Sequence, residues 1–208
     1  MTSPNATGGH VALRIQGRVW HNHGAMPHHH GRKPRPPLDT RRLDELALFY
    51  VGRFATSRAK LVIYLKRKLG ERGWDGPGEP DLGAIVERLA RLGYVDDAAF
   101  ALAKARSLTV RGYGAGRVRQ TLHAAGIGEE DAEGARDLAA DGAVAAAVKF
   151  ARRRSLGPFA KQASDDPRGR DRALSAMIRA GHGFALAKAI LVLPPGASID
   201  EEQLREIR

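Results

Sequence analysis

Lysine and arginine residues that could bind a polyanion gather in three short segments of the sequence. Residues 58–72 contain six basic residues and one acid, Glu71, and residues 104–119 contain five basic residues and no acid. Residues 149–154 add four more. Such clusters attract phosphate groups or acidic protein surfaces. The residues that we expect to make this contact are Lys60, Lys66, Arg67, Arg111, Arg117, Arg119, Arg152, Arg153 and Arg154.

The charge of the whole chain agrees with a polyanionic partner. The sequence has 34 Lys and Arg against 23 Asp and Glu, a formal net charge of +11. A solvated helix face would explain any single basic cluster equally well, and a positive charge also serves solubility. Three clusters at comparable places favour binding. Tyr64 in the first cluster and Tyr113 in the second are too few to indicate recognition of stacked bases.

No combination of residues indicates an enzyme or a cofactor site. Residues 112–116 are rich in glycine but lack the lysine of a phosphate-binding loop. Asp96 and Asp97 are adjacent carboxylates that suit helix capping better than acid–base catalysis. His123 and His182 are single histidines without an evident carboxylate partner. The sequence has no cysteine, which excludes disulfides and thiolate chemistry. We therefore expect no catalytic residue and no cofactor.

Residues 1–40 differ from the rest of the chain, because they combine six of the eight histidines with several prolines and glycines. We expect this segment to be disordered. In a disordered segment we expect its histidines to lack the supporting hydrogen bonds that orient metal ligands, so we expect no metal site. Met26 could start a shorter natural chain, in which case residues 1–25 would not belong to it. The clustered histidines considered as metal ligands are His21, His23, His28, His29 and His30.

The basic clusters lie on segments whose apolar residues recur at helical spacing. The first expected helix has an apolar face from Leu43 to Phe54. Thr56 and Ser57 can cap a second helix, which carries Leu61, Leu65 and Leu69 and ends at Gly70 or Gly73. Asp81 can cap a third helix. The inward residues expected on the first and third helices are Leu43, Leu46, Ala47, Tyr50, Val51, Phe54, Leu82, Ile85, Val86, Leu89 and Leu92.

The same three-helix unit then recurs. Asp96 caps an expected helix over residues 97–110, with Phe100, Ala103 and Leu108 inward. A second helix carries Val118 and Leu122 and ends at Gly126, and a weaker third helix covers residues 131–140. A last unit begins near Ala143. Its inward residues are expected to be Val144, Ala147, Val148 and Ala151, then Leu174 and Ile178, then Phe184, Leu186, Ile190 and Leu191, before Pro194 and Pro195 close the fold.

These starts, near residues 43, 96 and 143, predict an all-α fold of three tandem three-helix repeats that form an elongated, curved array. We expect the repeats at residues 41–95, 96–141 and 142–195, with a C-terminal tail at residues 196–208. We also expect a cytoplasmic protein, because the sequence has neither a signal-peptide pattern nor a long apolar stretch. We expect a monomer, because nothing in the sequence suggests a coiled coil.

Three segments resemble RecX regulatory proteins. The run Leu92-Gly93-Tyr94-Val95-Asp96-Asp97-Ala98-Ala99-Phe100-Ala101 resembles the junction between the first two repeats of that family. Residues 114–122, ending at Gly126-Ile127, resemble the second helix of its second repeat, and residues 57–74 resemble the counterpart in its first. The resemblance covers residues 40–193, and residues 155–170 depart from it.

The resemblance implies a partner that charge alone does not identify. RecX proteins bind RecA filaments on single-stranded DNA and mainly inhibit recombination, ATP hydrolysis and the co-protease activity behind the SOS response. The chain would then contact the RecA filament, and single-stranded DNA either directly or through RecA. Two alternatives remain open: a helix-turn-helix-like DNA-binding protein that acts without RecA, and a helical scaffold with an acidic protein partner.

Overall fold

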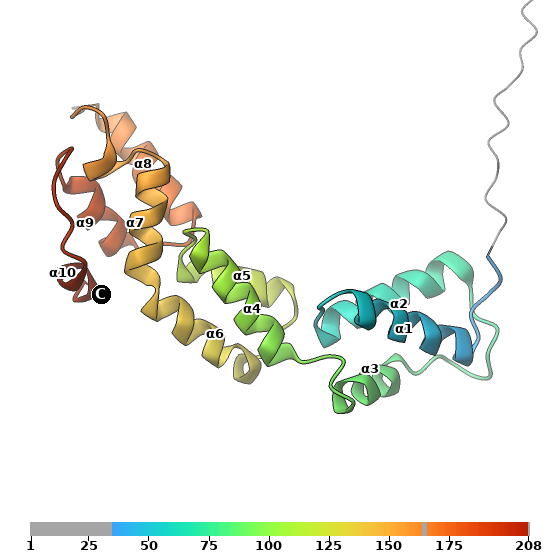
Figure 1. Cartoon of the computed structure of the whole chain (residues 1–208). Coiled ribbons are helices and arrows are strands. Elements are labelled where there is room, and N and C mark those ends of the chain that lie inside the picture. Colours follow the sequence, from blue (N-terminus) through green and yellow to red (C-terminus); the bar gives the residue numbers. More distant parts are fainter. Residues whose placement is uncertain (1–34, 164–165, 208) are drawn as a thin grey trace, which may run out of the picture. The chain divides into compact units, whose positions relative to one another are not determined.

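The computed structural model describes residues 35–163 and 166–207, and the regular elements of this part are all helices (Figure 1). Nine of them form three consecutive groups of three, each with its own cluster of buried apolar side chains. We refer to α1–α3, α4–α6 and α7–α9 as repeats 1, 2 and 3. The all-α, three-helix-repeat fold that the sequence predicts is confirmed. Of the segment expected to be disordered, residues 1–34 lie outside the described residues. The expectation is wrong for residues 38–40, because the Leu38 side chain is fully buried, Asp39 caps α1 and Thr40 begins that helix.

Repeat 1 consists of α1 (Thr40–Arg53), α2 (Arg58–Arg72) and α3 (Leu82–Arg91). The predicted caps are present, because the side chains of Ser57 and Asp81 accept backbone N–H groups of the helices that they precede. Two predicted inward residues are wrong: Phe54 is 51% exposed and Leu92 is 63% exposed. Both follow the last residue of their helix, where the helical spacing no longer applies. The buried side chains include Leu43, Ala47, Leu61, Leu65, Ile85, Val86 and Leu89.

Repeat 2 consists of α4 (Asp97–Val110), α5 (Ala115–Ala124) and α6 (Glu129–Asp141). Helix α4 has the predicted bounds and the predicted cap, Asp96. Helix α6 begins two residues before the predicted start. Ala103 is exposed, contrary to the prediction. The core instead takes Ala101, Ala105, Ala132, Ala135 and Ala139, whose small side chains let α4 and α6 pack closely.

Repeat 3 consists of α7 (Ala143–Arg153), α8 (Pro167–Arg179) and α9 (Phe184–Val192), with a short 3₁₀ helix η1 (Gly157–Phe159) after α7. Ile178 and Phe184 are exposed, contrary to the prediction, and Met177 is the fully buried residue of α8. The sequence pattern also missed α10 (Glu201–Arg205). Its Leu204 packs into the core of repeat 3, so part of the expected C-terminal tail is folded.

The second helices of the three repeats meet end to end. At the second joint, between repeats 2 and 3, the N–H groups of Gly114 and Gly116 at the start of α5 donate to the carbonyls of Ala180 and Gly181 after α8, at 3.0 and 2.9 Å. At the first joint, between repeats 1 and 2, the Ser57 hydroxyl donates to the carbonyl of Ala125 after α5, at 2.6 Å. The N-terminus of α2 therefore faces the C-terminus of α5, and the N-terminus of α5 faces the C-terminus of α8. This is a favourable alignment of helix dipoles.

The two joints differ in how they are held. Backbone-to-backbone hydrogen bonds connect α5 to the end of α8. The first joint relies on side chains: besides the Ser57 bond, the carboxylate of Asp97 accepts the backbone N–H of Arg58 at 2.9 Å. Because side-chain bonds constrain two helices less than direct backbone contact, we expect the first joint to be the softer of the two.

Candidate polyanion-binding surface

The nine cationic residues predicted from the sequence, here called the basic face, come from all three repeats. Eight are exposed, and Lys60 is half-buried. Helix α2 carries Lys60, Lys66 and Arg67, and Arg111 follows α4 directly. Helix α5 carries Arg117 and Arg119. Helix α7 supplies the last part of the basic face with Arg152, Arg153 and the adjoining Arg154.

In repeat 1, an aromatic platform supports the cation of Arg67. Its guanidinium lies 5.6 Å from the ring centre of Tyr64, and that ring stacks on Tyr50 with centres 4.0 Å apart. Arg67 also lies 3.3 Å from the carboxylate of Glu71, so part of its charge is already neutralised. Lys68 shares both partners, with its ammonium 5.9 Å from the centre of the Tyr64 ring.

At the first joint, two lysines from neighbouring repeats share one ring. Lys60 of α2 and Lys104 of α4 each place the ammonium nitrogen 5.2 Å from the centre of the Phe100 ring. Phe100 itself is buried, so its ring is a fixed platform. Lys104 was not among the predicted site residues. Its position four residues after Phe100, on the same face of a helix, is the sequence signal that would have indicated it.

At the second joint, arginines take the place of the lysines. Arg111 and Arg153 lie 5.6 and 5.9 Å from the centre of the Tyr113 ring. Arg153 also donates a hydrogen bond to the backbone carbonyl of Arg111 at 2.7 Å, which ties the end of α4 to the end of α7. The other arginines of this segment rest on rings too: Arg154 lies 5.7 Å from the ring centre of Phe150, and Arg152 lies 4.9 Å from that of Phe159.

The rest of the basic face is less constrained. Arg117 donates to the side-chain oxygen of Gln120 at 2.9 Å on the same helix. Lys66 and Arg119 point into solvent from α2 and α5. Among residues 35–163 and 166–207, Arg67 is the one member of the basic face with a carboxylate within 4.0 Å. The others keep an uncompensated charge, and such a charge is available to an external anion.

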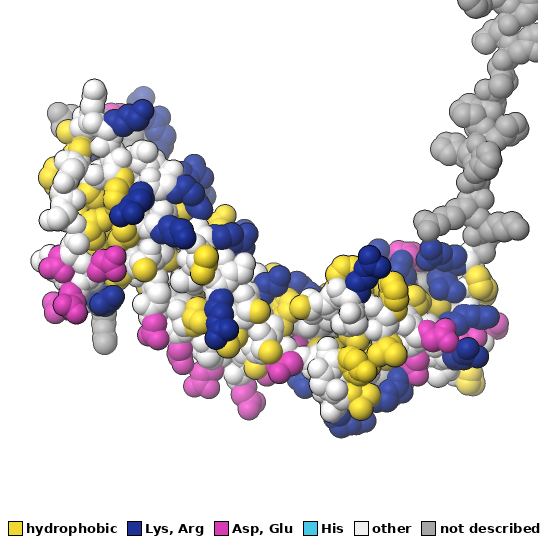
Figure 2. Space-filling model, viewed as in Figure 1, with side chains coloured by type: hydrophobic (Ala, Val, Ile, Leu, Met, Phe, Trp, Pro, Cys, Tyr) yellow, Lys and Arg dark blue, Asp and Glu magenta, His cyan; other side chains and the backbone are white. Residues whose placement is uncertain are grey.

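Acidic side chains gather elsewhere. Figure 2 shows Asp and Glu along α6 and near α10, whereas Lys and Arg lie over α7 and α8. Arg58, a basic residue outside the predicted set, is used internally: its guanidinium lies 3.8 Å from the carboxylate of Glu87 and 4.0 Å from that of Asp131. The surface over α7 and α8 is therefore mainly basic in this view, whereas acidic and basic side chains lie side by side over repeat 1 (Figure 2).

Two titratable side chains are buried, but they lie at different joints and do not form a catalytic pair. Burial raises the pKa of the Asp97 carboxyl at the first joint, although the N–H of Arg58 opposes this shift. Burial lowers the pKa of His182, beside the second joint, to about 4. The His182 ring packs 5.3 Å from the ring centre of Phe150. Within the part of the chain that the structure describes, no group of three potential metal ligands occurs.

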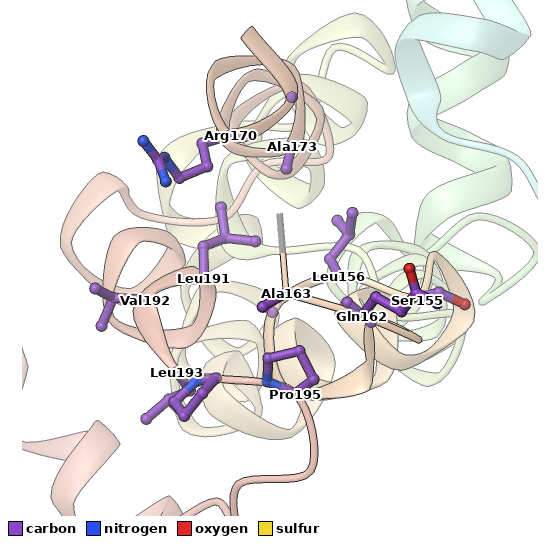
Figure 3. Close-up of a pocket in the computed structure, with 14 residues that line it drawn as sticks. Ser155, Leu156, Gln162, Ala163, Arg170, Ala173, Leu191, Val192, Leu193 and Pro195 are labelled. Atoms are coloured by element: carbon purple, nitrogen blue, oxygen red, sulfur yellow. The ribbon is translucent and has the colours of Figure 1, made fainter. Parts of the chain in front are cut away.

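A cavity of about 390 Å³ lies in repeat 3, between the end of α7, the start of α8 and the segment after α9 (Figure 3). Its lining is mostly apolar, and its one charged residue, Arg170, points away from Leu156 and Ser155 in this view. We assign no ligand to it.

None of the helices in residues 35–163 and 166–207 has the length and apolar character needed to cross a bilayer.

Comparison with known proteins identifies relatives of this fold and sequence. Residues 96–135 match the family model described as RecX, second three-helix domain. The chain is 31% identical over 177 residues to a protein named Regulatory protein RecX from Myxococcus xanthus (strain DK1622), an alignment that covers 77% of this chain and 89% of that protein.

Two crystal structures share the fold. One, of RecX from Lactobacillus salivarius, has a TM-score of 0.53 and 19% identity, and the match covers 73% of this chain and 93% of the other. The second, of a regulatory protein RecX, has a TM-score of 0.54 and 23% identity, and the match covers 73% of this chain and 72% of the other. At these identities the two structures establish the arrangement of the helices and nothing further.

Proposed function

The chain belongs to the RecX family of regulatory proteins, and from that membership we propose that it binds RecA filaments on DNA and mainly inhibits them. The inhibited activities would be recombination, ATP hydrolysis and the co-protease activity that starts the SOS response. Such a protein would act as a monomer in the cytoplasm and would need neither catalytic residues nor a cofactor.

One observation carries this proposal for the present chain. Within the described residues, eight of the nine cations of the basic face lack a carboxylate within 4.0 Å, and they are distributed over all three repeats. A polymeric partner can meet several of these cations at once. Because each exposed charge pair contributes little alone, several weak contacts along one filament would combine into useful avidity.

The proposed contacts are direct and electrostatic. Lys60, Lys66 and Arg67 would bind through repeat 1, Arg111, Arg117 and Arg119 through repeat 2, and residues 152–154 through repeat 3. The anions are either acidic side chains of RecA or phosphates of the DNA within the filament. A chain that spans more than one RecA subunit would resist the movements that accompany filament growth and ATP hydrolysis.

A direct test compares binding to the filament with binding to bare DNA. The full chain carries one fluorophore, and its anisotropy is followed while RecA–single-stranded DNA filaments or the same DNA alone are added at about 150 mM salt, where the Debye length is ~8 Å. We expect markedly tighter binding to the filament. Equal affinity for the filament and for bare or duplex DNA would favour the alternative of a DNA-binding protein that acts without RecA.

A charge-reversal pair tests the residues. We expect Arg117→Glu with Arg119→Glu to weaken filament binding about tenfold, which corresponds to ~1.4 kcal/mol. The control is Arg91→Glu with Arg106→Glu, which changes the net charge equally at two exposed positions outside the basic face. Filament binding that is unchanged by the first pair, or equally weakened by both, would contradict the assignment of these residues.

A further inference from the structure

Each joint between repeats carries two cations, one from each neighbouring repeat, over a single aromatic ring. At the first joint these are Lys60 and Lys104 over Phe100, each at 5.2 Å. At the second joint they are Arg111 and Arg153 over Tyr113, at 5.6 and 5.9 Å, and Arg153 also lies 5.5 Å from the ring centre of Phe150. The same arrangement therefore occurs twice, although the residue types and the helices that supply them differ.

The two charges of a pair repel each other. Because Lys60 and Lys104 lie equally far from one ring centre, their ammonium groups are no farther apart than twice that distance, about the Debye length of ~10 Å at 0.1 M salt. Within the described residues neither has a carboxylate within 4.0 Å. The ring face attracts both cations but carries no net charge, so the repulsion between the lysines persists.

This repulsion acts across a joint that few bonds hold. The first joint depends on the hydrogen bonds from Ser57 to Ala125 and from the N–H of Arg58 to Asp97, and on the ion pair at 4.0 Å between Arg58 and Asp131. A pair of like charges that straddles it opposes its closure. An anion placed between the two lysines would remove the repulsion and attract both repeats, and the orientation of repeat 1 relative to repeat 2 would then be fixed.

We propose that these two pairs are phosphodiester-binding sites, and that a nucleic-acid backbone bound to them fixes each repeat relative to its neighbour. The inference rests on the proposed function and specifies one of its two options, in which the basic residues contact phosphates of the DNA. A nucleic-acid strand presents one negative charge per nucleotide at regular intervals, so a single strand can supply an anion to both joints. The guanidinium groups at the second joint suit the paired oxygens of a phosphate.

The chain lends itself to a distance measurement, because it has no native cysteine to interfere with labelling. Spin labels at Ala84 and Ala140 report on the first joint, and labels at Ala140 and Ser175 report on the second. All three positions are exposed and lie outside the basic face. Double electron–electron resonance then gives the distance distribution across each joint, in the full chain without RecA, with and without an oligothymidylate at about 50 mM salt.

We expect the oligothymidylate to narrow both distributions. In Lys60→Met with Lys104→Met, which keeps the apolar stems on Phe100 and removes the charges, narrowing should be lost across the first joint and kept across the second. Arg111→Met with Arg153→Met should give the reverse. The matched control, Arg91→Met with Arg106→Met, should behave like the unsubstituted chain.

Four results would overturn the inference. Three are no binding of the oligonucleotide, binding without narrowing, and narrowing that survives loss of the local pair. The fourth is equal narrowing by poly-glutamate, because the sites would then recognise acidic protein rather than phosphodiester. RecA is absent from this experiment. If the chain still binds RecA filaments tightly, a negative result here refutes the joint sites alone and leaves the proposed function in place.

Discussion

The end-to-end contact between α8 and α5 makes a strong prediction about Gly181. This residue has φ +92°, and a Cβ on it would lie 2.2 Å from the backbone nitrogen of Arg117. Its carbonyl accepts the N–H of Gly116, and the carbonyl before it accepts the N–H of Gly114. Gly181→Ala therefore strains the backbone and also pushes the end of α8 away from the start of α5.

The magnitude follows from these two effects. A side chain in the left-handed region costs about 1–2 kcal/mol. Loss of the two backbone hydrogen bonds adds about 1 kcal/mol each, so Gly181→Ala should lower the free energy of unfolding by about 3–4 kcal/mol. Gly93→Ala is the matched control: Gly93 has φ +76° and follows a helix in the same way, but a Cβ there would have no other atom within 4 Å. Only the strain of about 1–2 kcal/mol applies to it.

Urea unfolding, followed by the helical circular dichroism signal, measures the difference. With a slope of about 2 kcal/mol per molar urea, the midpoint of Gly181→Ala should fall about 1 M below that of Gly93→Ala. Equal midpoints for the two variants would refute the conclusion that close backbone contact holds the second joint.

Three further predictions concern buried side chains. Burial holds the pKa of His182 near 4, below its ordinary 6.5, so the stability from its neutral form is complete above pH 6.5 and is lost as the pH falls toward 4. Urea midpoints at pH 7 and pH 4.5 should show a loss of about 2 kcal/mol from this residue, and this loss should be absent in His182→Leu. Ser57→Ala removes two hydrogen bonds, the one that the Ser57 hydroxyl accepts from the backbone N–H of Lys60 and the one that it donates to the carbonyl of Ala125. It should lower the free energy of unfolding, measured by thermal unfolding, by about 2 kcal/mol. Met177→Ala leaves a cavity in the core of repeat 3 and should cost about 2–5 kcal/mol in urea unfolding, whereas a cost below 1 kcal/mol would contradict its burial.

Local chemistry accounts for the features of the fold that the sequence predicts well. Asp96 and Ser57 are capping residues directly before an apolar periodicity, and both begin a helix where expected. The errors arise where spacing alone is ambiguous. In α8, both Met177 and Ile178 fit a helical face, and only the packing of α8 against α7 and α9 selects Met177 for the core. Helix α10 has five residues, too few to show a period.

The sequence shows which cationic residues are clustered along the chain, but it does not show which of them lie together in space. Lys60 and Lys104 are distant in sequence, and they meet over Phe100 only because the second helices of neighbouring repeats abut. The sequence pattern therefore indicates where positive charge is concentrated along the chain, and the tertiary structure determines which charges lie next to one another.

The most direct test of the central claim is the ATP hydrolysis that RecA carries out on single-stranded DNA, measured with RecA from the same organism while this chain is added in substoichiometric amounts. The proposed function predicts a progressive loss of hydrolysis well below one chain per RecA subunit, and a much weaker loss with Arg117→Glu and Arg119→Glu. Undiminished hydrolysis in the presence of the folded, helical chain at equimolar concentration would contradict it.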